Sequence, residues 1–233
     1  MNIIIKQIPN TITCLNLFSG CIACVMAFYG DYFCAALFIY LAAVFDFLDG
    51  MAARLLNAYS KIGKELDSLA DMISFGFAPG VILFSWLQTM QGEISILPYA
   101  AFLIPVFSAL RLAKFNIDTR QTSSFIGLPT PANAIFIASL ISLPDNACLQ
   151  SLLHNICFII ILIVILSFLL VCELPMFSLK FKSLSWKSNQ TRYIFLSLSI
   201  ILLIIFQLTA IPLIILLFIF MSLVLQIKRS LCK

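Results

Sequence analysis

The chain has 233 residues, of which 62% are hydrophobic and only 10% are charged, and its mean hydropathy is +1.10. Soluble domains are typically about one quarter charged, so this composition excludes a soluble globular protein and indicates a polytopic membrane protein. The formal net charge of +4 is too small and too dispersed to favour nucleic-acid binding.

The apolar runs predict an all-α bundle of eight membrane-spanning helices, since one span needs about 20 mostly apolar residues. In chain order the predicted spans are Thr11–Tyr29, Tyr32–Ala53, Leu69–Met90, Ile94–Ala113, Pro131–Leu143, Leu152–Cys172, Arg192–Leu208 and Ile211–Ile227. We expect one domain over residues 1–233, with a core at about 8–173 and a C-terminal helical hairpin at about 192–227. The start of the chain carries one lysine and runs directly into the first span, so no cleavable signal peptide is predicted.

The basic residues predict the orientation of these spans. If the N-terminus is cytoplasmic, eight spans put every Lys and Arg on the cytoplasmic side. The opposite turns hold Asp31, Glu93 and Asp145 and no basic residue. The positive-inside rule therefore places both termini in the cytoplasm, and it supports the short fifth span.

Cysteine and histidine give little reason to expect redox or soft-metal chemistry. Cys21 and Cys24 form a CxxC pair, but both fall inside the first predicted span, where cysteine packs as a small hydrophobe. His154 is the only histidine. Any metal site in this chain is therefore expected to use oxygen ligands.

Four aspartates stand where the second predicted span ends and the third begins, in the stretch DFLDGMAARLLNAYSKIGKELDSLAD. Asp46 and Asp49 are three residues apart, and Asp67 and Asp71 are four apart. Each spacing puts two side chains on one helical face. Because the two spans form a hairpin, we expect the four carboxylates to meet in one cavity at the cytoplasmic membrane boundary.

Such a cluster needs a counter-charge. Arg54 is one cation, and Lys61 and Lys64 are predicted to lie in the connecting loop. Two divalent ions, Mg²⁺ or Mn²⁺, are the more economical answer, and such a pair can clamp a phosphoryl oxygen while a hydroxyl attacks. Gly50 and Ala53 would keep this helix face open for a ligand.

A purely structural interpretation explains only half of the cluster. Asp67 and Asp71 would suit the first turn of a helix. Asp46 and Asp49 stand at the end of an apolar helix, where the helix dipole disfavours them. Acids at this depth indicate function.

The same stretch resembles the signature of the CDP-alcohol phosphatidyltransferases, D-x2-D-G-x2-A-R, eight residues, then G-x3-D-x3-D. Every fixed position is present at the required spacing: Asp46, Asp49, Gly50, Ala53, Arg54, Gly63, Asp67 and Asp71. The resemblance implies a six-helix core, here followed by two further spans, a homodimer and a cavity open to the cytoplasm. It also implies transfer of a phosphatidyl group from a CDP-linked lipid to an alcohol, with release of CMP.

The resemblance also implies roles for the signature residues. The implied ligands of two divalent ions are Asp46, Asp49, Asp67 and Asp71. Asp71 is also the implied base that takes the proton of the attacking hydroxyl. The implied parts of the CDP site are Gly50, Ala53, Arg54 and Gly63, the last in a loop that would pass close to the nucleotide.

Three further segments narrow the resemblance to one branch of the family. They are PNTITCLN (Pro9–Asn16), SALRLAKFN (Ser108–Asn116) and FIGLPTPANA (Phe125–Ala134), and they are similar to segments of the bacterial and archaeal phosphatidylserine synthases. The resemblance thus covers about residues 8–135. It implies CDP-diacylglycerol and L-serine as substrates, in the inner membrane of a bacterium with the site facing the cytoplasm.

Residues in these segments have alternative interpretations. Asn10 and Thr13 could contact the nucleotide or cap the first span. Arg111, with Asn116 near it, could bind the carboxylate of serine or a lipid phosphate, or Arg111 could simply extend to the membrane interface.

Two other functions remain open at this point. A sister enzyme could use glycerol 3-phosphate or inositol phosphate, for which Arg111, Lys114 and Arg120 would form a basic pocket. A cation transporter could use the aspartates as its ion site. The transporter is disfavoured because the acids gather at one face and no broken helix pair is evident.

Overall fold

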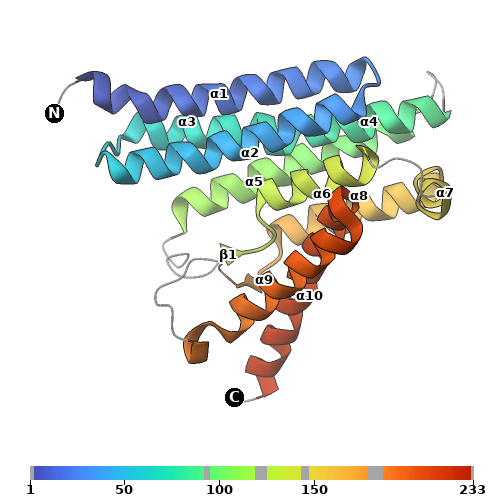
Figure 1. The fold of residues 1–233 in the computed structure, drawn as a ribbon. Helices are drawn as coiled ribbons and strands as arrows, with labels where there is room; N and C mark the ends of the chain where they lie inside the picture. Colours follow the sequence, from blue (N-terminus) through green and yellow to red (C-terminus); the bar gives the residue numbers. More distant parts are fainter. Residues whose placement is uncertain (1–2, 92–94, 119–124, 143–146, 178–185, 232–233) are drawn as a thin grey trace.

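The computed structural model describes residues 3–91, 95–118, 125–142, 147–177 and 186–231. Its long helical segments alternate in direction along the chain (Figure 1). The first elements are α1 Ile3–Phe28, α2 Tyr32–Leu55, α3 Lys61–Asp71, the π-helical η1 Met72–Phe77, α4 Ala78–Gln91, the 3₁₀-helical η2 Leu97–Phe102 and α5 Leu103–Ile117. The later elements are α6 Thr130–Ser142, α7 Ala147–Leu153, α8 Ile156–Val171, α9 Trp186–Phe206, the 3₁₀-helical η3 Gln207–Thr209 and α10 Ala210–Leu231. Two short strands, β1 Phe125–Ile126 and β2 Pro175–Met176, pair antiparallel.

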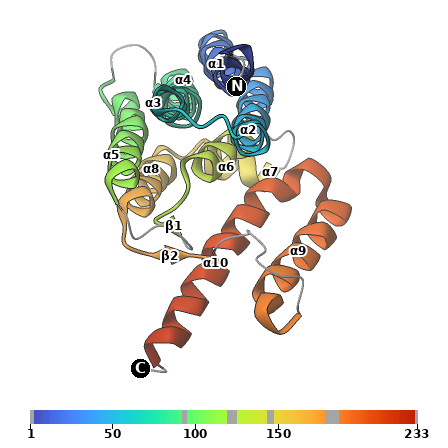
Figure 2. The same cartoon turned by 90° about the vertical axis from the view of Figure 1, so that its left-hand side faces the viewer.

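The predicted all-α membrane bundle is confirmed. Five helical segments are long and apolar enough to cross a membrane, and α6 and α8 are shorter apolar helices. The last of the five, Asn189–Ile227, contains both α9 and α10, which turn back on each other at η3 to form a hairpin (Figure 2). Gln207 makes this turn with a φ of +49°. The eight predicted spans therefore correspond to seven helical segments of the described residues, the last of which contains two spans. The predicted span ends at Ile94 and Leu143 lie outside the described residues.

The start of the first span was predicted too late. α1 begins at Ile3 rather than Thr11, so Asn10 and Thr13 lie inside the helix and cannot cap it. The Thr13 hydroxyl instead donates to the carbonyl oxygen of Pro9, 3.0 Å away, as threonines do within helices. The capping interpretation of these residues is wrong.

The loop before the third span is shorter than predicted, because α3 begins at Lys61. The Ser60 hydroxyl accepts a hydrogen bond from the backbone N–H of Gly63 at 2.9 Å and so caps the helix. Lys61, Gly63 and Lys64 are therefore helical and not part of a loop. Counting apolar residues missed this polar first half of the span.

A side-chain cap also corrects the sixth span. The Asn155 side chain accepts from the backbone N–H of Phe158 at 3.2 Å, so α8 begins at Ile156 and not at Leu152. Leu152 belongs to the separate short helix α7.

Small residues bring α1 close to its neighbours. α1 packs closely on α2, and the fully buried hydrophobic side chains of the two helices are mainly alanines, among them Ala23, Ala27 and Ala35. Side chains this small let helix backbones approach closely in a membrane, where packing drives helix association. A Cβ on Gly20 would lie 2.7 Å from the Cα of Ser74 in η1, so only glycine fits there.

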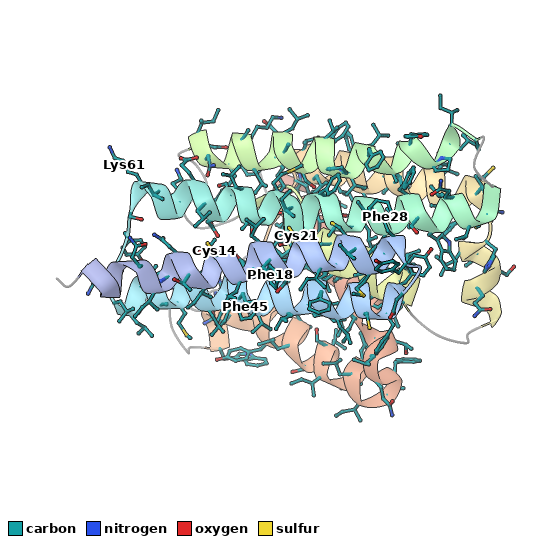
Figure 3. All side chains as sticks on the ribbon, turned by 90° about the horizontal axis from the view of Figure 1, so that it is seen from above. Cys14, Phe18, Cys21, Phe28, Phe45 and Lys61 are labelled. Carbon is teal, nitrogen blue, oxygen red and sulfur yellow. The ribbon has the colours of Figure 1, made fainter. Side chains whose placement is uncertain are left out.

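The two ends of the bundle differ in charge. In Figure 3, Lys61 stands at the end where α3 begins, and Phe28 stands near the opposite end. At that opposite end Asp31 caps α2 by accepting from the backbone N–H of Cys34 at 2.9 Å, which lowers the pKa of Asp31. Arg54, Lys64 and Lys114 belong to the first end, in the terminal turns of α2, α3 and α5.

Candidate active site

The C-terminal half of α2 and the C-terminal half of α3 bring three of the four predicted acids into one cluster. Carboxylate oxygens of Asp46, Asp49 and Asp67 all lie within 4.8 Å of one another. Asp46 and Asp49 come from successive turns of α2, and Asp67 faces them from α3. Three carboxylates this close repel one another strongly unless a cation lies between them.

Asp71 stands beside this cluster and is held separately. It ends α3 and lines one cavity together with Asp46 and Asp67. Its Oδ1 accepts a hydrogen bond from Nδ2 of Asn16 on α1, 3.5 Å away. The π-helical η1 follows at once, and such widened turns are frequent at functional sites.

A cavity of about 470 Å³ opens on one side of the acids, between α1, α2 and α3. All of the predicted nucleotide-site residues line it: Asn10, Thr13, Gly50, Ala53, Arg54 and Gly63. Asp49 and Asp67 form its acidic wall. The sequence-based grouping of these residues therefore agrees with their place in the structure, whereas their binding role stays a prediction.

The two signature glycines serve different purposes. Among the described residues, a Cβ on Gly50 would meet no atom within 4 Å beyond its chain neighbours and the backbone of its own helix, so this face of α2 is open toward the cavity. A Cβ on Gly63 would lie 2.9 Å from both Oδ1 of Asn10 and Oγ of Ser60. Gly63 thus lets α1 approach α3, and it does not act in a loop as predicted.

A second cavity, of about 240 Å³, lies on the other side of the acids. Asp46, Asp67 and Asp71 line it from α3 and α2, and Arg111 lines it from α5. Arg111 is only 7% exposed, and its Nε has no hydrogen-bond partner among the described residues. A buried guanidinium whose Nε donor is free, and which shares a cavity with carboxylates, is suited to an anionic ligand.

Asn116 also lines this second cavity, but its side chain is engaged. Its Nδ2 donates to the Ser68 hydroxyl at 2.9 Å, and its backbone oxygen accepts from Nζ of Lys64 at 3.3 Å. Asn116 therefore ties α5 to α3, and Arg111 is the better candidate for contact with a substrate.

The acid cluster has the chemistry of a divalent cation site. All three clustered ligands are carboxylates, which Mg²⁺ and Mn²⁺ prefer. Asp49 is only 6% exposed, and its Oδ2 is buried without a hydrogen-bond partner among the described residues. A buried carboxylate oxygen without a donor is unfavourable unless a cation binds it, so the residues fit a metal.

Comparison with known proteins agrees with this geometry. The sequence profile of the CDP-alcohol phosphatidyltransferase family matches residues 6–169, which include both cavities' acids and Arg111. The match covers well over half of the chain. The chain belongs to this family. Membership, together with the apolar helices, makes it an integral membrane protein and removes the cation-transporter alternative.

Several curated relatives are named as serine transferases or serine-lipid synthases. The chain is 41% identical over 126 residues to CDP-diacylglycerol–serine O-phosphatidyltransferase of Bacillus subtilis (strain 168), covering 54% of this chain and 70% of the relative. It is 39% identical over 140 residues to the Helicobacter pylori (strain ATCC 700392 / 26695) protein of the same name, covering 59% of this chain and 58% of the relative. It is 36% identical over 134 residues to archaetidylserine synthase of Methanothermobacter thermautotrophicus, covering 57% of this chain and 56% of the relative. The matched region thus spans less than two thirds of the last two relatives.

Sequence reasoning did not single out several residues that shape the site. Asn16 and Thr130 fall inside quoted segments, yet nothing local shows that one bonds to Asp71 and the other lines its cavity. Lys64 lines both cavities from α3 and was predicted to be a loop residue. A helical reading of residues 61–71 would have placed Lys64 on the same face as Asp67 and Asp71.

Proposed function

We propose that this protein is a phosphatidylserine synthase, which transfers the phosphatidyl group of CDP-diacylglycerol to the hydroxyl of L-serine and releases CMP. The observation that carries the proposal is that one acidic cluster separates two cavities. Asp67 lines both of them, with the signature residues of α2 on one side and Arg111 on the other. The names of the curated relatives support the choice of substrates.

Each cavity suits one substrate. The larger one, of about 470 Å³, would take the cytidine diphosphate group, with the open face at Gly50 and the exposed cation of Arg54 on its wall. The smaller one, of about 240 Å³, would take serine, whose carboxylate would bind the guanidinium of Arg111. The reacting phosphate would lie between them, beside Asp67.

With both substrates in place, the phosphatidyl group can pass directly from the donor to serine. The serine hydroxyl oxygen forms a bond to the β-phosphorus, and the bond from that phosphorus to the bridging oxygen breaks, so that CMP leaves with the electron pair. Asp71 accepts the hydroxyl proton, and Asn16 orients its carboxylate for this role. The helices hold the reacting groups in place, which removes much of the entropic barrier.

Two divalent cations, Mg²⁺ or Mn²⁺, would be held by Asp46, Asp49, Asp67 and Asp71. When bound, they would neutralise the pyrophosphate and stabilise the charge that develops on the leaving phosphate.

We further propose a cytoplasmic site in the inner membrane of a bacterium, and a homodimer. The orientation is supported by Arg54, Lys64, Arg111 and Lys114, which all belong to the end of the bundle that carries the acids. The membrane location agrees with a donor whose acyl chains stay in lipid while its headgroup reaches the aspartates. The single-domain organisation over residues 1–233 is part of the same proposal.

The test follows CMP release by purified protein in detergent with CDP-diacylglycerol and Mg²⁺ or Mn²⁺. L-serine, glycerol 3-phosphate and inositol phosphate are supplied separately. We expect release only with serine, its loss in Asp71→Asn, and its retention in Glu65→Gln, an exposed acid on α3 outside both cavities. Release with a phosphorylated acceptor and not with serine would overturn the choice of acceptor and leave the family chemistry intact.

A further inference from the structure

A third cavity, of about 480 Å³, lies between α6 and the C-terminal hairpin of α9 and α10. Every residue that lines it is apolar. Most of its wall comes from the hairpin, which lies beyond the segment matched by the family profile, residues 6–169. The family match therefore does not account for this cavity.

The apolar cavity adjoins the smaller polar one. Pro129 and Pro131, at the start of α6, line both. On the polar side these prolines stand with Asp71 and Arg111, and on the apolar side with Ile135. A lipid whose phosphate lies beside Asp67 can therefore pass along these prolines, at the border of the cavity proposed for serine, and place an apolar end against α6.

The depth of the apolar cavity suits one lipid chain. On α9 its lining runs from Phe195 to Leu203, which is about 12 Å at the rise of an α-helix. Half of a typical bilayer core is about 15 Å deep, the depth that one acyl chain spans in its own leaflet. The cavity follows the hairpin toward η3, away from the charged end of the bundle.

The wall formed by the hairpin is fixed to the rest of the protein. The ring of Phe177, just after β2, lies 5.5 Å from that of Phe195 on α9 and 4.8 Å from that of Phe218 on α10. The β1–β2 pair is in turn anchored at Gly127, whose N–H donates to the carbonyl oxygen of Leu174 at 2.9 Å. The same backbone segment leads into Pro129, so the hairpin and the entrance to the polar cavity are held by one structure.

We propose that this cavity binds one acyl chain of the CDP-linked lipid donor, and that the C-terminal hairpin thereby sets the donor's chain preference. This inference rests on the proposed function for the identity of the donor. Because the bilayer is as apolar as the cavity, transfer of the chain gains little hydrophobic free energy. The benefit is positional, since a fixed chain holds the reacting phosphate beside the aspartates.

A bulky side chain placed in the cavity should therefore lower kcat/KM for donors with long acyl chains more than for donors with short ones. Ile214 is half-buried and lines the cavity, whereas Leu216 on the same helix is 49% exposed and does not line it. For Ile214→Trp we expect kcat/KM with a dipalmitoyl donor to fall about tenfold and that with a dihexanoyl donor to change less than twofold. Leu216→Trp should leave both values near those of the unchanged protein. An equal fall for both donors in Ile214→Trp, or the same pattern in Leu216→Trp, would overturn the proposal.

A labelling experiment tests the cavity without turnover. CDP-diacylglycerol with a photoreactive group near the end of one acyl chain is irradiated with the full-length protein in vesicles of phosphatidylglycerol. We expect labelled residues on α6, α9 and α10, with labelling reduced by excess unlabelled donor. Labelling that the donor reduces but that falls on other helices would overturn this inference alone. Labelling that excess donor does not reduce anywhere would overturn it together with the proposed function.

Discussion

Asn16 on α1 donates a hydrogen bond to Asp71 at the end of α3, with 3.5 Å between Nδ2 and Oδ1. The backbone carbonyl of the same Asn16 accepts a second bond, from the Ser74 hydroxyl at 2.9 Å. Asn16 is fully buried, so α1 holds both Asp71 and the π-helical turn that follows it. The residue thus positions the proposed base without being part of the acid cluster.

We therefore predict that Asn16→Ala lowers the rate of CMP release at saturating serine by about 10- to 100-fold, the usual effect of losing a residue that orients a reacting group. The KM for serine should change little, because Asn16 does not line the serine cavity. Steady-state kinetics with varied serine separate the two parameters.

Ser19→Ala is the matched control for this change. Ser19 is also buried on α1, and among the described residues its hydroxyl donates only to the Leu15 carbonyl within the same helix, at 2.8 Å. If the two variants had the same kcat, Asn16 would have no positioning role.

A second prediction concerns divalent cations and stability. Three ionised carboxylates with oxygens within 4.8 Å repel one another, so the folded protein is expected to gain stability when a cation binds. At a free ion concentration about 100 times the dissociation constant, binding should stabilise the protein by about 2.7 kcal/mol and raise Tm by about 5 °C or more. Thermal unfolding in detergent with Mg²⁺, Mn²⁺ or a chelator measures this shift without any substrate.

Asp49→Asn should abolish most of that shift, because it removes a buried carboxylate oxygen that has no other partner among the described residues. Glu65→Gln, an exposed change on α3, should retain it. A Tm that rises equally with metal in all three proteins would show that the ion binds elsewhere.

The sequence predicted the acid cluster well because helical periodicity is local. Asp46 and Asp49 share a face of α2, and Asp67 meets them as soon as α2 and α3 form a hairpin. Spacing and the hairpin together were sufficient for these three, whereas Asp71, predicted to join them, stands beside the cluster. The start of α3 was missed because its first turn is polar and depends on the Ser60 cap rather than on hydrophobicity.

Contacts between distant segments could not be predicted in the same way. Asn16 and Asp71 are 55 residues apart, and their contact depends on how closely α1 packs on η1. That approach requires Gly20, whose role is evident only when its neighbour Ser74 is known. The apolar cavity could not be predicted either. Its wall includes Ile135 and a hairpin that begins more than 50 residues later, and the sequence of that hairpin indicates only membrane helices.

Two helical glycines should respond in opposite ways to the same added methyl group. In Gly20→Ala the Cβ would lie 2.7 Å from the Cα of Ser74, so the backbones of α1 and η1 must separate. We expect a loss of about 1–3 kcal/mol in the free energy of unfolding. In Gly50→Ala the Cβ meets no atom of another described segment within 4 Å, and the better helix propensity of alanine should leave Tm unchanged or higher.

Gly50→Ala should instead weaken donor binding, because the methyl group enters the larger cavity. The expected result is a higher KM for CDP-diacylglycerol at unchanged Tm, measured on the same preparation. An unchanged KM would show that the donor does not approach this face of α2.

The last prediction separates the two possible ligands of Arg111. Its guanidinium is 7% exposed and lines the smaller cavity with Asp71. Arg111→Lys keeps the charge but loses the paired donors that fit a carboxylate. If Arg111 binds serine, the KM for serine should rise about tenfold or more while the KM for the donor stays the same, since a charged hydrogen bond contributes about 1.5–3 kcal/mol. A rise in the donor KM alone would assign Arg111 to the lipid phosphate. Lys114→Ala, an exposed change one turn later on α5, controls for loss of basic charge at this end of the bundle.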